Sequence, residues 1–406
     1  MIRLIHTADW HIGQTFFGYE RKEEHISFFR WLKKIIRDRS ADVLLVSGDV
    51  FDSPNPSAES QKLYYKFLYE VTQENPFLQI IIIAGNHDSA ARLEAPSPLF
   101  KGMNITVRGV IKRTSEGEID YNHLIIPLIK NGKTEACCLA VPYLRQGDYP
   151  QAENYALGVS LLYKELISRA RLEAQCLVVM GHLQVIGSEI SEDDRSERAV
   201  IGGLEAVSPQ IFREGAAYVA LGHLHRAQKV TSPYIRYAGS PLPMSFAEKN
   251  YKQSVTGITL SSEDEVGKEI IETEILSFEP PVKLLSLPTQ ALPIDRGLAE
   301  LMLLPKGEVC SSSPYLEVKV VVNEPEPAMK YKIQEVLKDK AVRLARIVAM
   351  TPQMSESNYK FNNYEELQAV HPIDIACDFY GRKYGGGEMP DELKTLLNKI
   401  ISEVTL

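Results

Sequence analysis

The sequence predicts an α/β protein in which two β-sheets form a sandwich flanked by helices, followed by a small α+β domain and C-terminal helices. Apolar, β-rich runs alternate with segments of helical periodicity through about the first 180 residues, which is the pattern of a layered α/β fold. Strand-like runs joined by short turns then dominate residues 216–278. Two consecutive prolines, Pro280 and Pro281, separate this region from the rest of the chain.

The first part of the chain begins with the order strand, helix, strand, helix, strand. The predicted strands of this part are residues 2–7, 43–47, 78–84, 103–107, 123–129, 136–141 and 176–180. Two amphipathic helices are predicted from apolar residues that recur at spacings of three and four: Ile26, Phe29, Leu32 and Ile36 in the first, and Leu63, Phe67 and Val71 in the second. This order predicts a first sheet with helices packed on it.

A second sheet is predicted from the runs YVALG, YIRYAG, VTGITL and IIETEILSF, which lie between residues 216 and 278. Short turns separate these runs, and their apolar residues need a partner surface. We therefore expect this sheet to pack on the first one, so that residues 1–280 form one domain.

The paired prolines can continue neither a helix nor a sheet, so a domain boundary is predicted at residue 280. Strand-like runs at 316–322 and 342–348 and a helical stretch at 328–338 then outline a small α+β domain over residues 281–355. Residues 356–406 form a third, helical segment with an apolar stripe after a glycine break: Leu393, Leu396, Leu397, Ile400, Ile401 and Val404. This stripe either packs on its own domain or binds a partner chain, and the sequence leaves both possibilities open.

The composition is that of an ordinary globular protein. Apolar residues make up 44% of the 406 positions and charged residues 24%, which excludes collagen-like and wholly disordered chains. No apolar run approaches the ~18 residues of a membrane helix, so we expect a soluble, cytoplasmic protein without a membrane anchor. The net charge of -8 argues against DNA binding by overall charge but leaves a local basic groove open. The five cysteines lack a Cys-x-x-Cys spacing and are expected to be buried, reduced thiols.

Five short motifs place side chains that bind metals directly after strand-like runs. They are Asp9-Trp10-His11, Gly48-Asp49-Val50-Phe51-Asp52, Gly85-Asn86-His87-Asp88, Gly181-His182 and Gly222-His223-Leu224-His225. Sites in α/β sheets assemble at the carboxyl ends of strands, so side chains that are far apart in the sequence can converge there. One such motif alone usually caps a turn, but five in one chain indicate a site.

The chemistry of these side chains indicates a pair of metal ions. Carboxylate, amide and imidazole ligands without thiolate favour Mn²⁺, Fe²⁺ or Zn²⁺ over Ca²⁺. About seven ligands are more than one ion needs, whereas two ions roughly 3.5 to 4 Å apart and bridged by a carboxylate use the whole set. Two ions arranged in this way suit the hydrolysis of phosphate esters. The glycines before the ligands allow the backbone to approach closely.

The order of the motifs resembles that of the calcineurin-like metallophosphoesterase family. Further stretches narrow the resemblance to bacterial nuclease subunits of that family: HTADWHIGQ, GDVFDSPNPS, AGNHDSAARLEAPSPLF, SERAVIGG and YAGSPLPMSFAE. The resemblance covers essentially residues 1–280 and extends beyond them in architecture more than in motif. It implies a first metal ion held by Asp9, His11, Asp49 and His225, and a second held by Asp49, Asn86, His182 and His223, with Asp49 as the bridge.

The resemblance implies different roles for two further residues of the motifs. His87 would approach the scissile phosphate and stabilise its developing charge or protonate the leaving oxygen. The alternative is that His87 is another metal ligand or only supports its loop. Asp52 stands where some family members carry histidine, and we expect it to orient a ligand.

The activity and partners of this chain are also implied by the resemblance. Members of this branch are DNA nucleases, acting as double-strand exonucleases and as single-strand or hairpin endonucleases, with Mn²⁺ as the preferred metal. They act with an SbcC-like ATPase in DNA repair, recombination and replication, as homodimers within a heterotetramer, and their small domain caps the site and contacts DNA.

Two other functions compete with this one. A free-standing dimetal phosphodiesterase or phosphatase acting on small nucleotides would have the same ligands, but it would not need the domain and tail after Pro281. A catalytically inactive scaffold of the same fold would have no physical reason to keep so many costly polar groups together.

Overall fold

The computed structural model describes residues 1–174, 176–189, 206–213, 215–261, 270–322, 326–350, 372–383 and 388–404. The chain divides into two compact units. The first consists of Met1–Ser286, Pro305–Glu317 and Asp339–Arg346, and the second of Leu287–Leu304, Val318–Lys338 and Ile347–Leu406. The boundary predicted at residue 355 lies outside the described residues. Within the described ranges, no helix has the length and apolarity needed to cross a membrane.

The first sheet has six strands in the order β14, β13, β1, β4, β5, β6. Four of them run parallel, namely β1 (Ile2–Thr7), β4 (Val43–Ser47), β5 (Gln79–Ile83) and β6 (Ile105–Arg108). Helices α1 (Lys22–Asp38) and α2 (Ala58–Glu74) connect the first three, which confirms both predicted helices. Strand β13 (Ser254–Ser261) pairs antiparallel with β1, and β14 (Ile270–Ser277) pairs antiparallel with β13 at the edge of the sheet. Shorter elements are the hairpin β2 (Thr15–Phe16) and β3 (Tyr19–Glu20), and α3 (Ala90–Glu94), α4 (Ser97–Phe100) and η1 (Lys101–Met103).

The second sheet has the strand order β11, β12, β10, β9, β8, β7. Its strands are β7 (Ile125–Lys130), β8 (Lys133–Ala140), β9 (Leu177–His182), β10 (Tyr218–Gly222), β11 (Gln228–Val230) and β12 (Ser232–Tyr237), and its helices are α5 (Tyr121–Leu124), α6 (Tyr155–Ala170) and α7 (Gln210–Arg213).

The prediction that residues 216–278 alone form the second sheet was wrong. Strands β7, β8 and β9 join it from the first part of the chain, and β13 and β14 return to the first sheet because β13 pairs with the edge of β1. The strand predicted at 123–129 also begins too early. Asp120 caps a helical turn there by accepting a hydrogen bond from the backbone N–H of His123 at 3.3 Å.

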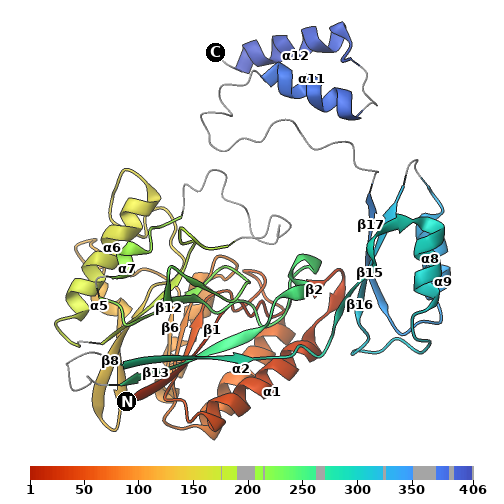
Figure 1. Ribbon diagram of the computed structural model, residues 1–406. Coiled ribbons are helices and arrows are strands. Elements are labelled where there is room, and N and C mark those ends of the chain that lie inside the picture. Colours follow the sequence, from red (N-terminus) through yellow and green to blue (C-terminus); the bar gives the residue numbers. More distant parts are fainter. Residues whose placement is uncertain are drawn as a thin grey trace. The chain divides into compact units, whose positions relative to one another are not determined.

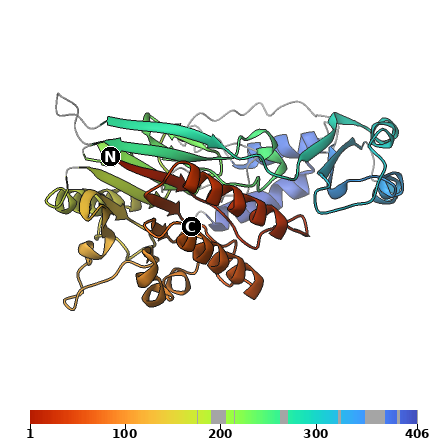
Figure 2. The same ribbon diagram turned by 90° about the horizontal axis from the view of Figure 1, so that it is seen from below.

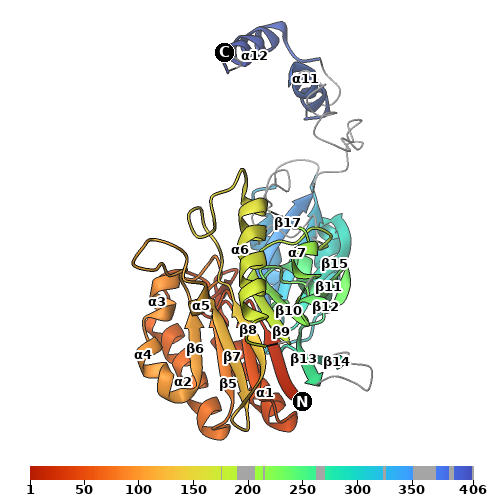
Figure 3. The same ribbon diagram turned by 90° about the vertical axis from the view of Figure 1, so that its left-hand side faces the viewer.

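The two sheets and their helices form four layers with three apolar seams. Alternate residues of each strand point to opposite faces, so Leu45 and Ile83 face Met180 and Ala220 in the seam between the sheets. The other face of the first sheet packs against α1 and α2, which lie side by side (Figures 1 and 2). The second sheet is covered by α6 (Figure 3). The carboxyl ends of strands from both sheets therefore reach one edge of the sandwich.

A third sheet follows with the strand order β15 (Leu284–Pro293), β16 (Tyr315–Val321), β17 (Arg343–Met350). Helices α8 (Ile294–Met302) and α9 (Met329–Leu337) pack on each other. The predicted strands at 316–322 and 342–348 and the predicted helix at 328–338 are confirmed, whereas β15 was not predicted. Helices α11 (Pro372–Lys383) and α12 (Asp391–Val404) follow, and α12 carries the exposed side chains of Leu393 and Leu396 from the predicted stripe.

The cysteines are all free thiols. Cys137 and Cys138 are buried in β8, where two consecutive residues face the two apolar seams of the second sheet. The prediction of burial was wrong for Cys310, which is exposed in the loop before β16, and only partly right for Cys176 and Cys377, which are half-buried.

Candidate metal centre

The five predicted motifs lie at the carboxyl ends of five strands taken from both sheets. The first sheet supplies the loops after β1, β4 and β5, which carry Asp9 and His11, Asp49, and Asn86 and His87. The second sheet supplies His182 at the end of β9, and His223 and His225 after β10. The convergence expected from strand ends is therefore observed.

Asp49 lies at the centre of the cluster. Its Oδ2 is 3.7 Å from Nε2 of His11 and 3.3 Å from Nε2 of His182, and its Oδ1 accepts a hydrogen bond from the backbone N–H of His87 at 2.8 Å. Ligand atoms of His11, Asp49 and His87 lie within 4.8 Å of one another, and so do those of Asp9, Asp49 and His182. Asp49 is common to both groups, which is the position that a bridging carboxylate requires.

Asn86 joins the two histidines on one side of the cluster. Its Oδ1 is 2.8 Å from Nε2 of His182 and 3.1 Å from Nδ1 of His223. The backbone N–H of His223 donates to Oδ1 of Asp9 at 2.9 Å, which ties the loop after β10 to the loop after β1. Nδ1 of His182 lies 2.8 Å from the backbone oxygen of Ser47, so the ring is held from behind by the first sheet.

His11 lies on the other side, next to His87 and His225. The centroid of its ring is 4.8 Å from that of His87 and 5.1 Å from that of His225. Oδ1 of Asp52 is 3.4 Å from Nδ1 of His11, the location expected of a residue that orients a ligand. All eight predicted site residues therefore belong to one connected cluster.

The ring of His87 is oriented by the backbone of Asp52, in the loop after β4. Its Nδ1 lies 2.9 Å from the backbone oxygen of Asp52, an acceptor, so Nδ1 carries the hydrogen. Nε2 is then the atom that can meet a substrate or an ion. The ring donates a proton from Nε2 only as imidazolium, whereas neutral His87 offers a lone pair there. The geometry is compatible with both roles left open for this residue.

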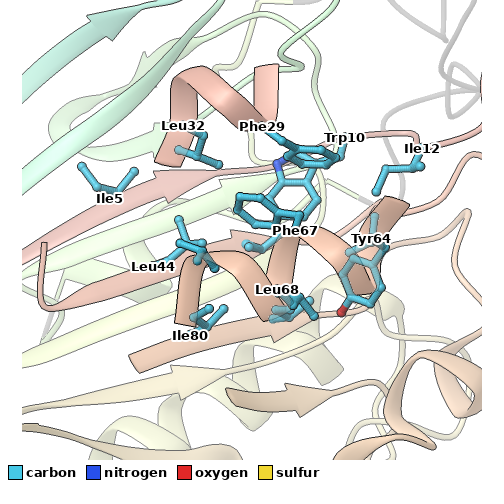
Figure 4. Packing of buried hydrophobic residues seen from close by; sticks show 14 of the residues in the cluster. Ile5, Trp10, Ile12, Phe29, Leu32, Leu44, Tyr64, Phe67, Leu68 and Ile80 are labelled. Carbon is cyan, nitrogen blue, oxygen red and sulfur yellow. The ribbon is translucent and has the colours of Figure 1, made fainter. Parts of the chain in front are cut away.

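The loop after β1 is held by the apolar seam beneath it. Trp10 is fully buried against the rings of Phe29 and Phe67 (Figure 4), and its Nε1 donates to Oγ1 of Thr7 at 2.9 Å. The backbone oxygen of Trp10 lies 2.8 Å from Nε2 of His25 in α1. Trp10, the side chain between the two predicted ligands of this motif, thus anchors the loop that carries both of them.

The backbone is strained at three of the predicted ligands. Asp9, His11 and Asp49 have φ of 53°, 45° and 49°, in the left-handed region that costs a residue with a side chain about 1 to 3 kcal/mol. Gly48 has φ of 90°, and a Cβ there would overlap the ring of His182. A Cβ at Gly85 would overlap the carboxylate of Asp49. Glycine before the ligand is thus required for close packing, as the sequence predicted.

Buried polar atoms without hydrogen-bond partners mark where ions would bind. Oδ2 of Asp9, Oδ2 of Asp49 and Nε2 of His11 have no such partner among the described residues, although all three side chains are buried. An unpaired buried polar atom costs about 1 to 3 kcal/mol, which coordination to a cation would offset. Carboxylate, amide and imidazole groups at these separations fit a pair of divalent transition-metal ions.

The ionisable groups of the cluster perturb one another strongly. Burial raises the pKa of Asp9 to about 6, although His182 and His225 oppose this shift. Burial would also raise the pKa of Asp49, but the imidazoles of His182 and His11 hold it well below its usual range. Burial would lower the pKa of His182, but the Asp49 carboxylate outweighs it and raises this pKa to about 10. Protons therefore neutralise the cluster without ions, and metal ions must displace them.

Two acidic residues support the site in ways that the sequence did not reveal. Asp88 is buried and accepts hydrogen bonds from the backbone N–H groups of Gly85, Val50 and Phe51 at 2.9, 3.1 and 2.9 Å. Glu248 is buried beside His225. Asp88 stands within a recognised motif, so its position was a signal, whereas nothing in the sequence connects Glu248 to the histidine motif before it.

Comparison with known proteins agrees with this site. Residues 2–227 match the calcineurin-like phosphoesterase family, and residues 281–384 match the family described as type 5 capsule protein repressor C-terminal domain. The chain is 35% identical over 370 residues to the SbcD subunit of the SbcCD nuclease of Rhodobacter capsulatus, which covers 87% of this chain and 88% of that protein.

Two further relatives carry the same description. The SbcD subunit of the Bacillus subtilis SbcCD nuclease is 29% identical over 416 residues, covering 99% of this chain and 98% of the relative. The Escherichia coli K12 protein of that name is 31% identical over 276 residues, covering 64% of this chain and 66% of the relative. With its metal-binding cluster and its match to both family models, this chain belongs to the calcineurin-like phosphoesterases and, within them, to the SbcD nuclease subunits.

Proposed function

We propose that this chain hydrolyses phosphodiester bonds of DNA at the cluster around Asp49, as the nuclease subunit of a complex with an SbcC-like ATPase. The observation that carries the proposal is that Asp49 belongs to both groups of potential ligands. The site is that of a metal-dependent phosphoesterase, and relatives named as nuclease subunits extend over nearly the whole chain. The predicted activities are double-strand exonuclease and single-strand or hairpin endonuclease.

Two divalent ions are assigned to the cluster, and Mn²⁺ is the proposed metal. The first is assigned to Asp9, His11, Asp49 and His225, and the second to Asp49, Asn86, His182 and His223. The contact of Asn86 with both His182 and His223 supports the second set. When bound, ions of this kind lower the pKa of water and neutralise charge on a phosphate.

His87 is the proposed catalytic residue among the chain's own side chains. Its ring lies beside His11 and is oriented by the hydrogen bond from Nδ1 to the backbone oxygen of Asp52. As imidazolium, it would donate from Nε2 to a phosphate oxygen or to the leaving oxygen. A donor held in this way needs no reorientation when charge develops in the transition state.

A basic and aromatic pair next to the cluster is a proposed contact for DNA. The ring of Tyr143 lies 6.2 Å from that of His182, and the guanidinium of the exposed Arg145 lies 5.6 Å from the Tyr143 ring. A guanidinium near the reacting phosphate would bind the backbone of the nucleic acid without reading its sequence. The small domain of residues 281–355 is proposed to contribute further DNA contacts.

The partner and the assembly are proposed from the family. The C-terminal segment, residues 356–406, would bind the SbcC-like ATPase, and the exposed Leu393 and Leu396 of α12 support an apolar docking surface. Two copies of the chain would form a homodimer within a heterotetramer. The proposed location is the cytoplasm, in keeping with five free cysteines.

The proposal is tested by cleavage of an end-labelled DNA duplex and a labelled hairpin by the purified chain. We expect Mn²⁺-dependent products that increase when the ATPase partner and ATP are added. Asp49→Asn should abolish them, whereas Asp38→Asn, which changes an exposed carboxylate at the end of α1, should not. Hydrolysis of small nucleotides without any DNA cleavage, with or without the partner, would refute the assignment as a DNA nuclease.

A further inference from the structure

The carboxylate of Glu248 contacts the back of a predicted metal ligand. Glu248 lies in the short helix η3 (Phe246–Asn250) and is completely buried. Its Oε1 is 3.0 Å from Nδ1 of His225, and its Oε2 accepts a hydrogen bond from the backbone N–H of Met244 at 2.8 Å. Burying a carboxylate is costly, so one whose two oxygens are both engaged in this way is expected to have a specific task.

We propose that Glu248 is a positioning residue that fixes the tautomer and orientation of His225 for metal binding. The inference rests on the proposed function in one respect, the assignment of His225 as a ligand of the first ion. Because an ionised carboxylate only accepts hydrogen bonds, Nδ1 of His225 must carry the hydrogen. Nε2 then keeps its lone pair, which is the form in which imidazole binds a metal. The carboxylate also makes the ring a stronger electron donor.

The surroundings hold Glu248 in place independently of any ion. The loop before η3 is fixed by Arg21, whose Nη1 donates to the backbone oxygen of Pro243 at 2.6 Å. The ring of Phe246 is buried against Phe16, in an apolar cluster that also contains Tyr315. The residue that orients His225 is therefore anchored on both sides.

The acceptor that faces Nδ1 of His182 differs from the acceptor that faces Nδ1 of His225. Nδ1 of His182 faces the backbone oxygen of Ser47, which also fixes the tautomer but carries no net charge. His225 is instead held by a full negative charge that a single substitution can remove. The second ion should therefore be insensitive to Glu248, whereas the first should depend on it.

Glu248→Gln is the substitution that tests this role. The glutamine amide has the shape of the carboxylate but only one oxygen. If this oxygen accepts from His225, the NH₂ group faces the N–H of Met244; if the amide is reversed, the NH₂ group faces Nδ1 and forces the hydrogen of the ring onto Nε2. Glu94→Gln is the matched control, because Glu94 is also buried, accepts from Gly109 at 2.8 Å and lies near a histidine that is not a ligand.

The measurement is Mn²⁺ binding to the full chain by calorimetry and by metal analysis after dialysis, without DNA. Wild type and Glu94→Gln should bind two ions, whereas Glu248→Gln should bind one with unchanged affinity and the other 10- to 100-fold more weakly. The visible absorption spectrum of the Co²⁺-loaded protein should change only in Glu248→Gln. If both ions bind to this variant within threefold of the wild-type affinity, the proposal is overturned.

A double-mutant cycle separates a positioning role from a general loss of structure. If Glu248 acts through His225, adding Glu248→Gln to His225→Ala should weaken Mn²⁺ binding no further, and an additive effect would refute the proposal. If His225→Ala binds both ions normally, the ligand assignment fails rather than the role of Glu248 in holding the ring. Should Glu248→Gln not fold, Glu248→Asp takes its place, because the shorter carboxylate cannot reach both partners, and unchanged binding by it would equally refute the proposal.

Discussion

Replacing Asp88 is expected to damage both the stability of the protein and its metal site. The carboxylate accepts three backbone hydrogen bonds, from Gly85 in the loop after β5 and from Val50 and Phe51 in the loop after β4. These two loops carry Asn86 and Asp49. Asp88 is 1% exposed, so no bulk water can replace it as an acceptor.

The magnitude follows from the donors that are left unpaired. An unsatisfied buried N–H costs about 1 to 3 kcal/mol, so Asp88→Ala loses about 3 to 9 kcal/mol of hydrogen bonding. The substitution also removes a buried charge, which offsets part of this loss. Burial and the charge of Asp49 raise the pKa of Asp88 to about 6, so its charged form is costly in the wild type. We expect a net decrease of about 3 to 5 kcal/mol in the free energy of unfolding. In Asp88→Asn the amide oxygen can keep two of the three bonds, and we expect about 1 to 3 kcal/mol.

The assay is urea unfolding in EDTA at pH 8, where Asp88 is ionised, followed by Mn²⁺ binding to the folded variants. Asp120→Ala serves as the control, because Asp120 caps a helical turn through a single backbone hydrogen bond, and its loss should cost only about 1 kcal/mol. Both ions should bind more weakly to the Asp88 variants, since both loops lose their connection. A decrease below about 1 kcal/mol in Asp88→Ala, or unchanged affinity for both ions, would show that the three hydrogen bonds do not hold the two loops in place.

Four further outcomes are expected. Asp49→Ala should disturb both Mn²⁺ ions because Asp49 is the proposed bridge; metal analysis that finds one ion in the wild type, or an unaffected second ion in the variant, would exclude a dinuclear site. His87→Ala should keep both ions and near-normal DNA binding while the cleavage rate in Mn²⁺ falls by about 10² to 10³; loss of an ion would make His87 a ligand instead. Removal of residues 363–406 should leave cleavage of single-stranded DNA intact and abolish stable complex formation with the SbcC-like ATPase, so co-purification at full yield would contradict the docking role. Finally, burial and Arg236 lower the pKa of His6 to about 3, so its imidazole is neutral in the folded protein. The free energy of unfolding should therefore fall by up to about 1.4 kcal/mol per pH unit as the pH drops from about 6.5 towards 3. His6→Gln should remove this contribution to the slope, and a variant with the wild-type slope between pH 6 and 4 would disprove the role of His6.

The convergence of the predicted ligands could be foreseen from the sequence because each ligand is fixed by a local pattern. A metal-binding side chain directly after a strand is placed at the strand's carboxyl end whichever sheet that strand joins. For this reason His182 and His223 were expected in one cluster, although the sequence assigned their strands to different parts of the fold. Membership of the sheets depends on pairing between distant segments, such as β13 with β1, and no local pattern records it.

The residues that support the ligands were missed for the same physical reason. The contact between His225 and Glu248 depends on how a loop folds back after β12, and the acidic side chain has no periodicity or spacing that indicates it. Asp88 could have been noticed, since it follows Asn86 and His87 in one motif, but its three backbone partners lie in two loops. The positive φ of Asp9 and Asp49 likewise gave no signal, because neither is a glycine.

The seam between the two sheets determines how far apart the two sets of predicted ligands lie. Ser47, at the end of β4, donates from Oγ to the backbone oxygen of Ala220 at 3.0 Å and accepts with its own backbone oxygen near Nδ1 of His182. A Cβ at Gly222 would overlap that same oxygen of Ser47, so the sheets can approach this closely only if residue 222 has no side chain. The predicted ligands of the first sheet and the histidines of the second sheet therefore meet because the two backbones are in close contact at Ser47. Gly222, the glycine before His223, therefore sets the spacing between the sheets as well as the path of its own loop.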